Sequence, residues 1–358
     1  MKTCFAVGAV ILTVAIGSVQ AQREQRPQAA AGGPSKSYVP SKTPWGDPDI
    51  QGGYSNVNEN GIPFEKPDTL GNKQLGEVDD SELAELVKDR NQRAEANAAT
   101  IGGRETGAGP VHWYEHYNAK NSRAWMVVDP SDGHIPAQTP AARQRIGAGR
   151  GGVVAAGRGA GVQEGGRADS WLDRSFYDRC ITRGFPGSML PGVYGNSYQI
   201  VQGAGFVAIR YEMIHETRVI PLDGRPHAGA GIRLDMGDAR GRWDGNTLVV
   251  ETTNFRERSA YRNANAGLLR LVERFTRTAP DKIEWSLTVT DPSTWTRPWT
   301  FAIPLTMNDS ERIMEYACHE GNRAMENILS GARAEEDAVK KGLKASVSAV
   351  PTAAEGER

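Results

Sequence analysis

The sequence predicts a mainly β protein: an antiparallel meander that closes into a barrel or a strongly curved sheet, with a few peripheral helices. The first observation is the alternation of polar and apolar residues over 198–255, because successive strand side chains point to opposite faces of a sheet. The second is the pair of Asp-Gly turns at 223–224 and 244–245, since such pairs tolerate the positive φ of tight hairpins. The third is the stretch 247–255, which is rich in the β-branched residues that favour strands.

The two ends of the chain differ in composition from the part that carries the strands. Residues 1–21 read as a signal peptide, with a lysine, an apolar run and a closing Val-Gln-Ala. A membrane anchor is the alternative, but the apolar run is short for a span of about 20 residues. Residues 22–44 and 344–358 are expected to be a disordered leader and tail. Residues 45–343 then form a single β-rich domain, with a glycine-rich insert at 146–167.

Cleavage of the signal peptide would leave two cysteines, Cys180 and Cys318, in the periplasm or outside the cell. Thiols in an oxidising compartment usually pair, so the sequence predicts a disulfide between them. The closed loop of about 139 residues corresponds to ~5 kcal/mol in the chain-entropy model. A catalytic Cys318 is the alternative, because His319 and Glu320 follow it directly.

The N-terminal third carries one clear helix and several short extended segments. Residues 45–54 lead into a first strand, with aromatic anchors at both ends. Residues 79–99 predict a helix that begins at a capping box, Asp79-x-x-Glu82. Residues 123–128 read as a short strand, and a short helix over 170–181 would bring Cys180 to the core.

The C-terminal third shows period-2 alternation in two long segments. The apolar row of the first is Ile283, Trp285, Leu287 and Val289. The second runs over 295–305 and contains Pro298 and Pro304, which place it at an edge, an end or a bulge. Residues 313–318 are predicted as a last strand, and residues 332–343 as a polar helix.

Charge and motif content exclude several classes of partner. Lys plus Arg (42) nearly balances Asp plus Glu (43), and no basic block stands out, which argues against a nucleic-acid partner. The glycine-rich insert lacks the strand-loop-helix frame of a nucleotide loop. His112 and His116 share a face and could hold a metal, but an aromatic cluster explains them as well. We therefore predict no cofactor, no metal, and no stable membrane insertion after signal cleavage.

Five motifs resemble a large group of uncharacterised secreted bacterial proteins. They are Trp-Gly-x-Pro-Asp-x-Gln-Gly at 45–52, Val-Asp-Pro-x-Asp-Gly-x-Ile-Pro at 128–136, Ile-Pro-Leu-Asp-Gly-Arg-Pro-His at 220–227, Gly-Asp-x-Arg-Gly-Arg-Trp-x-Gly-x-Thr-Leu-Val-Val-Glu-Thr-Thr-Asn-Phe at 237–255, and Tyr-Ala-Cys-His-Glu-Gly-Asn at 316–322. The resemblance implies secretion but no reaction. The opening Gly-x-aromatic at 52–54 and the meander are also similar to lipocalin-like barrels.

Four residues are candidates for proton transfer, because imidazole titrates near neutrality and a carboxylate follows each histidine. They are His215, Glu216, His319 and Glu320. Neighbours on one strand point apart, so a working pair would have to form across strands, as His215 with Glu320 or His319 with Glu216.

A second set could bind a ligand, and consists of Tyr211, Arg240, Arg242, Trp243, Trp295 and Trp299. The guanidinium groups could clamp a carboxylate, and the indoles could stack on a sugar or an aromatic ring. The alternatives are that Asp238 and Asp244 pair with the two arginines to fix the loop, and that the tryptophans pack in the core.

Three functions follow from these candidates. The first is a secreted or periplasmic barrel that binds a small amphipathic or aromatic molecule. The second is an acid/base enzyme, a hydrolase, lyase or isomerase, that uses histidines in the cavity. The third is an interaction module of the cell envelope, which would present an exposed aromatic patch.

Overall fold

The computed structural model describes residues 38–100, 121–148, 168–192 and 194–342. The predicted signal peptide and most of the leader, His112 and His116, most of the glycine-rich insert and all of the predicted tail lie outside these residues.

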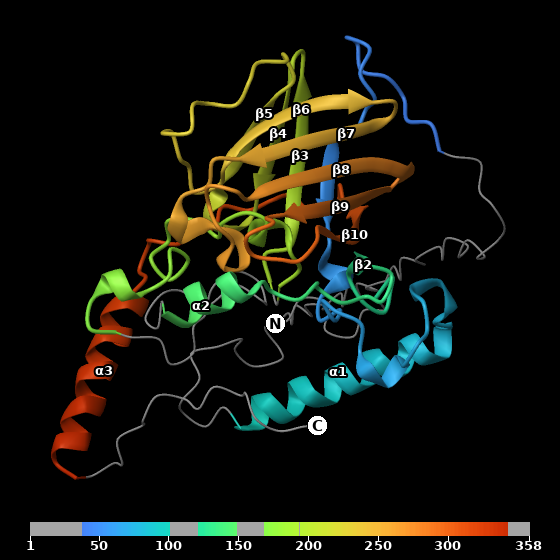
Figure 1. Ribbon diagram of the computed structural model, residues 1–358. Coiled ribbons are helices and arrows are strands. Elements are labelled where there is room, and N and C mark those ends of the chain that lie inside the picture. Colours follow the sequence, from blue (N-terminus) through green and yellow to red (C-terminus); the bar gives the residue numbers. More distant parts are fainter. Residues whose placement is uncertain (1–37, 101–120, 149–167, 193, 343–358) are drawn as a thin grey trace, which may run out of the picture. The chain divides into compact units, whose positions relative to one another are not determined.

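The described residues form one antiparallel sheet of ten strands (Figure 1). The strands are β1 (Gly52–Ser55), β2 (Val127–Asp129), β3 (Ser197–Gly203), β4 (Phe206–Tyr211), β5 (Thr217–Pro221), β6 (Asp238–Asp244), β7 (Thr247–Thr253), β8 (Arg270–Ala279), β9 (Lys282–Thr290) and β10 (Trp299–Met307). Their order in space is β5-β4-β3-β1-β10-β9-β8-β7-β6, and β2 pairs with β10 beside this path. The meander predicted over 198–255 is confirmed as β3 to β7, and the strands predicted at 283–289 and within 295–305 correspond to β9 and β10. β8 is not among the predicted strands.

The two ends of this order, β5 and β6, lie against each other and nearly close the sheet into a barrel. Gly241 of β6 makes this approach possible. A Cβ atom at this position would lie 2.5 Å from Leu222 Cδ2 and 2.8 Å from Ile220 Cγ2, closer than such atoms can approach. The predicted barrel is confirmed, and the glycine in its Arg-Gly-Arg motif has a packing function at the seam.

The interior of the barrel is filled by the inward rows of the strands. In β9 the burial alternates residue by residue, and the predicted row Ile283, Trp285, Leu287 and Val289 is fully buried. Phe275 of β8 stacks on Trp285 with ring centroids 6.4 Å apart, and Phe301 of β10 contacts the same indole edge-on at 5.5 Å.

The chain before β1 covers one end of the barrel. Gln202 Oε1 accepts a hydrogen bond from the Ile50 amide (2.7 Å), and Gln202 Nε2 donates to the Pro48 carbonyl (3.0 Å). Arg277 Nη1 donates to the Asp49 carbonyl at 3.0 Å. These hydrogen bonds fix the backbone of residues 48–50 across this end of the barrel. A binding site is therefore sought at the opposite end.

The described residues contain three α-helices: α1 (Asp80–Thr100), α2 (Pro140–Ala148) and α3 (Ala324–Lys340). The predicted capping box of α1 is confirmed, because the Glu82 amide donates to Asp79 Oδ1 (3.0 Å) and the Asp79 amide donates to Glu82 Oε2 (3.2 Å). Among the described helices, none combines the length and the apolar composition needed to cross a bilayer.

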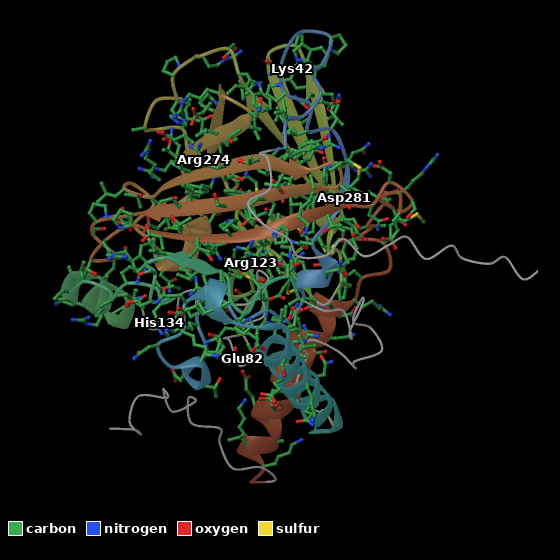
Figure 2. The ribbon with its side chains drawn as sticks, turned by 90° about the vertical axis from the view of Figure 1, so that its right-hand side faces the viewer. Lys42, Glu82, Arg123, His134, Arg274 and Asp281 are labelled. Atoms are coloured by element: carbon green, nitrogen blue, oxygen red, sulfur yellow. A yellow bond between two sulfur atoms is a disulfide. The ribbon has the colours of Figure 1, made fainter. Side chains whose placement is uncertain are left out.

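The connection before β2 is fixed to the sheet by an ion pair. Arg123, labelled in Figure 2, pairs with Glu284 of β9 at 2.6 Å and donates to the Ala302 carbonyl at 3.0 Å. The Ala302 amide in turn donates to Met126. Pro304 lies two residues after Ala302, so its backbone nitrogen faces the same edge of β10. At that point β10 lies between the residues that pair with β2 and the residues that pair with β1. The missing N–H of Pro304 therefore breaks no ladder, which explains a proline inside a central strand.

Three sequence-based predictions are wrong in detail. Residues 313–318 contain no strand, although they alternate in polarity, because they run outside the sheet and pair with no neighbour among the described strands. The helix expected over 170–181 is reduced to one 3-10 turn, Trp171–Asp173, followed by irregular chain. The C-terminal helix begins earlier than predicted, at Ala324.

Candidate functional site

Arg218 is the residue around which the candidate site is built. It lies in β5, where burial alternates, and it pairs in register with Ile209 of β4. Both side chains therefore point into the barrel. The Arg218 side chain is only 4 % exposed, which makes it an arginine in an otherwise apolar wall.

Glu273 of β8 meets Arg218 across the barrel interior. The two strands are not neighbours in the sheet, and Glu273 Oε2 accepts a short hydrogen bond from Arg218 Nη2. The other carboxylate oxygen, Oε1, accepts from Trp285 Nε1 at 3.1 Å. The carboxylate is fully buried, so both of its oxygens are bound by protein donors.

Burial and the charge of the partner act in opposite directions on the pKa of each member of this ion pair. Burial raises the pKa of the Glu273 carboxyl, while the charge of Arg218 and the two hydrogen bonds act to lower it. Burial acts to lower the pKa of Arg218 and is the largest single effect, but the charge of Glu273, the neighbouring Tyr211 and the hydrogen bond to Glu273 together outweigh it, and the net pKa is raised. Arg218 therefore remains a cation, and its stability inside the barrel depends on Glu273.

The polar groups around this pair are only partly satisfied. Arg218 Nε and Nη1 and the Tyr211 hydroxyl are buried, and none of them has a hydrogen-bond partner among the described residues. Burial raises the pKa of Tyr211, so its hydroxyl stays protonated and able to donate. We call Tyr211, Arg218, Glu273 and Trp285 the interior polar cluster.

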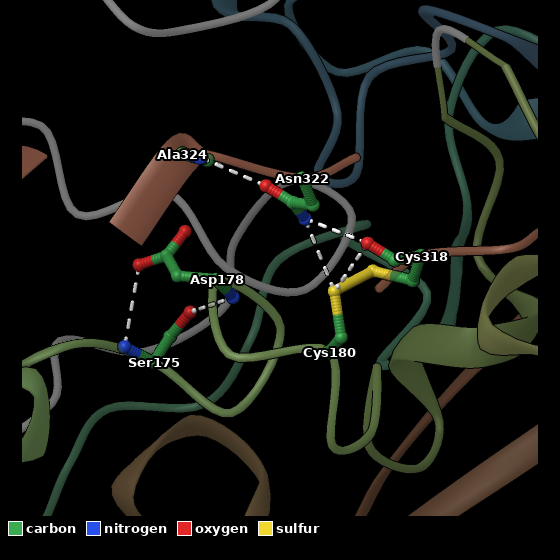
Figure 3. The surroundings of a disulfide bond; sticks show 6 residues. All are labelled: Ser175, Asp178, Cys180, Cys318, Asn322 and Ala324. Carbon is green, nitrogen blue, oxygen red and sulfur yellow. Dashed lines mark hydrogen bonds between the residues drawn. A yellow bond between two sulfur atoms is a disulfide. The ribbon is translucent and has the colours of Figure 1, made fainter. Parts of the chain in front are cut away.

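Phe185 covers the interior polar cluster at the barrel end. Its ring centroid lies 4.1 Å from the guanidinium carbon of Arg218, a cation–π contact. Phe185 belongs to an irregular segment anchored just before it by the disulfide between Cys180 and Cys318. The predicted disulfide is confirmed, with Cα atoms 5.7 Å apart (Figure 3).

The residues proposed for proton transfer lie around this anchored segment rather than in the barrel wall. Glu216 Oε2 accepts from the Thr182 hydroxyl at 2.9 Å. His319 and Glu320 are exposed and lie in a turn directly after Cys318. His215 belongs to the 3-10 turn Met213–His215, and its side chain lies outside the described part of the structure. The disulfide therefore brings the loops of Glu216 and His319 into one region.

The two arginines of the Arg-Gly-Arg motif have different surroundings. Arg240 pairs with Asp238 and donates to the Pro226 carbonyl at 3.1 Å, so the loop-fixing alternative is confirmed for this residue. Asp244 pairs instead with Arg274 at 2.9 Å (labelled in Figure 2), and the expectation that it holds Arg242 is wrong. Arg242 is exposed.

His227 completes the same outer surface. Its Nδ1 lies 3.1 Å from Asp238 Oδ2 and its Nε2 lies 3.5 Å from Glu251 Oε1. Arg240 and Arg270 neutralise the two carboxylates. Within the described residues no three His, Cys, Asp or Glu side chains gather closely enough to hold a metal ion.

The tryptophans proposed as ligand contacts lie largely in the core. Trp299 is fully buried, Trp295 is nearly so, and their rings meet edge-on at 5.6 Å. Trp243 is half-buried and packs against the same core. Core packing accounts for these positions, and their role in ligand binding stays a prediction.

Sequence reasoning missed Arg218, Glu273 and the ion pair between them, and it identified Tyr211 alone among the residues at this end of the barrel. If the alternation over 198–255 ran unbroken through 210–220, Tyr211 and Arg218 would lie on opposite faces of one strand. In the structure a 3-10 turn interrupts that strand, with Ile214 at φ 59°, so residues of opposite parity both point inward. A signal was available for Glu273, which stands between Leu271 and Phe275 in an alternating stretch that is not among the predicted strands.

Comparisons with known proteins identify no family. No protein-family model matches this chain, and neither does any curated protein. A crystal structure of a secretary abundant heat soluble (SAHS) protein from Ramazzottius varieornatus is similar over 37 % of this chain and 87 % of its own, with 11 % identity and a TM-score of 0.24. A superposition this loose supports no argument about this chain.

Proposed function

We propose that this protein binds a small amphipathic or aromatic molecule at the barrel end where Tyr211 and Arg218 lie. One observation carries the proposal: three buried hydrogen-bonding groups there have no partner in the described structure. A buried polar group left unpaired costs about 1–3 kcal/mol. An acceptor oxygen on a bound molecule would satisfy the Arg218 and Tyr211 donors together.

The surroundings favour a ligand that is apolar apart from this oxygen. Phe185 lies over the guanidinium, and Tyr198 packs edge-on against Tyr211 with ring centroids 6.1 Å apart. Small ligand sites combine an apolar lining with a few polar groups that fix orientation. A carboxylate or carbonyl attached to an aromatic or aliphatic body fits this lining, and no nucleic-acid or membrane-inserted partner is proposed.

We also propose that the protein works in the periplasm or outside the cell. The disulfide supports this location, because disulfides persist in oxidising compartments. The signal peptide that would direct export remains a prediction, and N-terminal sequencing of the mature protein would test it.

Acid/base catalysis is the second candidate function, supported by the disulfide that brings the loops of Glu216 and His319 together. It predicts turnover of a bound molecule that His319→Ala abolishes with little change in melting temperature. A bound molecule recovered unchanged after prolonged incubation would count against it.

Binding is tested with benzoate, cinnamate and dodecanoate, followed by tryptophan fluorescence and by calorimetry. We expect at least one of them to bind with one site per chain, and Tyr211→Phe to weaken it by about tenfold, the loss of one hydrogen bond to a charged group. Arg242→Met is the matched control, because it removes an exposed guanidinium from the same barrel. Equal affinity in the wild type and in Tyr211→Phe would refute the site.

A further inference from the structure

Arg183 is buried without a carboxylate partner. It is 6 % exposed and lies two residues before Phe185. Its Nη1 donates a long hydrogen bond of 3.5 Å to the Gly195 carbonyl, and its Nε has no partner in the described structure. Arg174 and Arg218, the other buried arginines of the described chain, pair with Asp178 and Glu273.

A buried cation without an opposite charge is costly, since its lost hydration is not repaid by a nearby anion. The loop holds this cation in place all the same. Gly192 lies so close that a Cβ there would be 2.5 Å from Arg183 Nη2. Asn196 closes the loop, because its side chain accepts from the Gly192 amide (2.7 Å) and donates to the Gly192 carbonyl (2.9 Å).

Three phenol groups form a hydrogen-bonded group, two of whose members lie within the electrostatic reach of Arg183. The hydroxyls of Tyr177, Tyr194 and Tyr316 hydrogen-bond to one another, and the charge of Arg183 acts on Tyr177 and Tyr316. Burial raises the pKa of Tyr177 and that of Tyr316, so both hydroxyls stay protonated at neutral pH. Phenol hydroxyls rotate about the ring bond and can redirect their protons to a new acceptor.

We propose that Arg183, Tyr177, Tyr194 and Tyr316 form a binding site for an oxyanion, either a small inorganic anion or the phosphate or carboxylate of a larger molecule. A guanidinium supplies charge and a fork of donors, and the hydroxyls supply further donors. The three tyrosines come from the segment before Cys180, the segment before β3 and the segment before Cys318, so the disulfide holds two sides of the site together. The site is separate from the interior polar cluster and does not depend on the function proposed above.

The test is calorimetric titration of the full-length mature protein with sodium phosphate and sodium sulfate, in buffers matched in ionic strength with sodium chloride. We expect saturable binding with one site per chain. Tyr316→Phe should weaken the affinity by about tenfold, as one lost hydrogen bond to a charged group implies. Arg183→Met should abolish binding. It should also melt at or above the wild-type temperature in chloride, because it removes an unpaired buried charge.

Two controls separate this site from its surroundings. Tyr261→Phe removes a buried phenol elsewhere in the core and should leave anion binding unchanged. Tyr211→Phe, which tests the barrel site, should also leave the affinity for inorganic phosphate and sulfate unchanged, so failure of the barrel site and failure of this site give different results. Should Arg183→Met not fold, Tyr316→Phe decides, because that side chain is only partly buried.

A second titration, with decyl phosphate and dodecanoate, distinguishes a free inorganic anion from the anionic group of a larger ligand. Binding of inorganic phosphate or sulfate supports a free anion as ligand. Binding of an amphiphile alone, with the same loss in Tyr316→Phe, supports the anionic group of a larger ligand. No binding of any of these anions, or equal binding in the wild type and in both variants, overturns the proposal.

Discussion

Removal of one partner of the Arg218–Glu273 pair should destabilise the protein far more than removal of both. Both groups are desolvated, with side chains 4 % and 0 % exposed, so each single variant leaves an uncompensated polar group in the barrel. Breaking a buried ion pair costs about 3–5 kcal/mol, whereas replacing both partners with apolar residues is neutral or stabilising by about 1–4 kcal/mol. We therefore expect Arg218→Met and Glu273→Gln each to lower the free energy of unfolding by about 3–5 kcal/mol, and Arg218→Met/Glu273→Leu to restore it.

The two single variants should differ in their pH dependence. In Arg218→Met the Glu273 carboxyl loses the charge that lowers its pKa, so burial raises that pKa further and the folded state keeps a proton that the unfolded state releases. Stability then falls as pH rises from the unfolded pKa to the folded one, by about 1.4 kcal/mol per pH unit. In Glu273→Gln the remaining cation cannot be deprotonated near neutrality, so its cost is independent of pH.

Urea denaturation at several pH values between 5 and 8, followed by tryptophan fluorescence, measures both effects. Arg242→Met serves as the control, since it removes an exposed guanidinium and should change stability by less than about 0.5 kcal/mol. Losses that add in the double variant would refute the coupling across the barrel. A pH-independent loss in Arg218→Met would refute the protonation of Glu273.

Three other perturbations test the rest of the structure. Gly241→Ala should destabilise the seam by about 1–3 kcal/mol through overpacking against Ile220 and Leu222, measured by urea denaturation; unchanged stability would mean that the seam is looser than the structure shows. Cys180→Ala should cost about 2–5 kcal/mol, and the wild type should lose a similar amount when reduced; a smaller loss on reduction alone would point to packing of the side chain. The hydrogen bond and charge of Arg270 lower the pKa of Glu251, so its contribution is complete above the ordinary value of 4.5 and is lost as pH falls below it. Glu251→Gln should therefore lose less stability than the wild type between pH 5 and pH 3, and parallel curves would contradict this.

Much of the fold follows from local patterns in the sequence. The alternating row of β9, the Asp-Gly turn between β6 and β7, and the capping box of α1 each need only neighbouring residues, and all three are confirmed. The disulfide also follows from composition, because only two cysteines lie outside the predicted signal peptide.

The site does not follow from local patterns, for two physical reasons. A single 3-10 turn at Met213–His215 changes the phase of the strand alternation. The turn contains no glycine or asparagine that would predict the left-handed conformation of Ile214. The Arg218–Glu273 pair also requires closure of the sheet, which brings β5 opposite β8. Residues 313–318 show the converse case, since alternation without a free neighbouring strand produces no strand.

Stability alone does not explain why charged groups persist inside this barrel. Apolar replacements of the Arg218–Glu273 pair would serve the core as well or better. Arg183 has an even weaker structural reason to be buried, because it has no carboxylate partner in the described structure. Tyr198 is linked to both groups: its ring packs against Tyr211, and the charge of Arg183 acts to lower the pKa of its hydroxyl, which burial raises. Two cations and their donor hydroxyls are thus concentrated at one end of the barrel, and recognition of anionic or oxygen-bearing molecules is the function that such an arrangement favours.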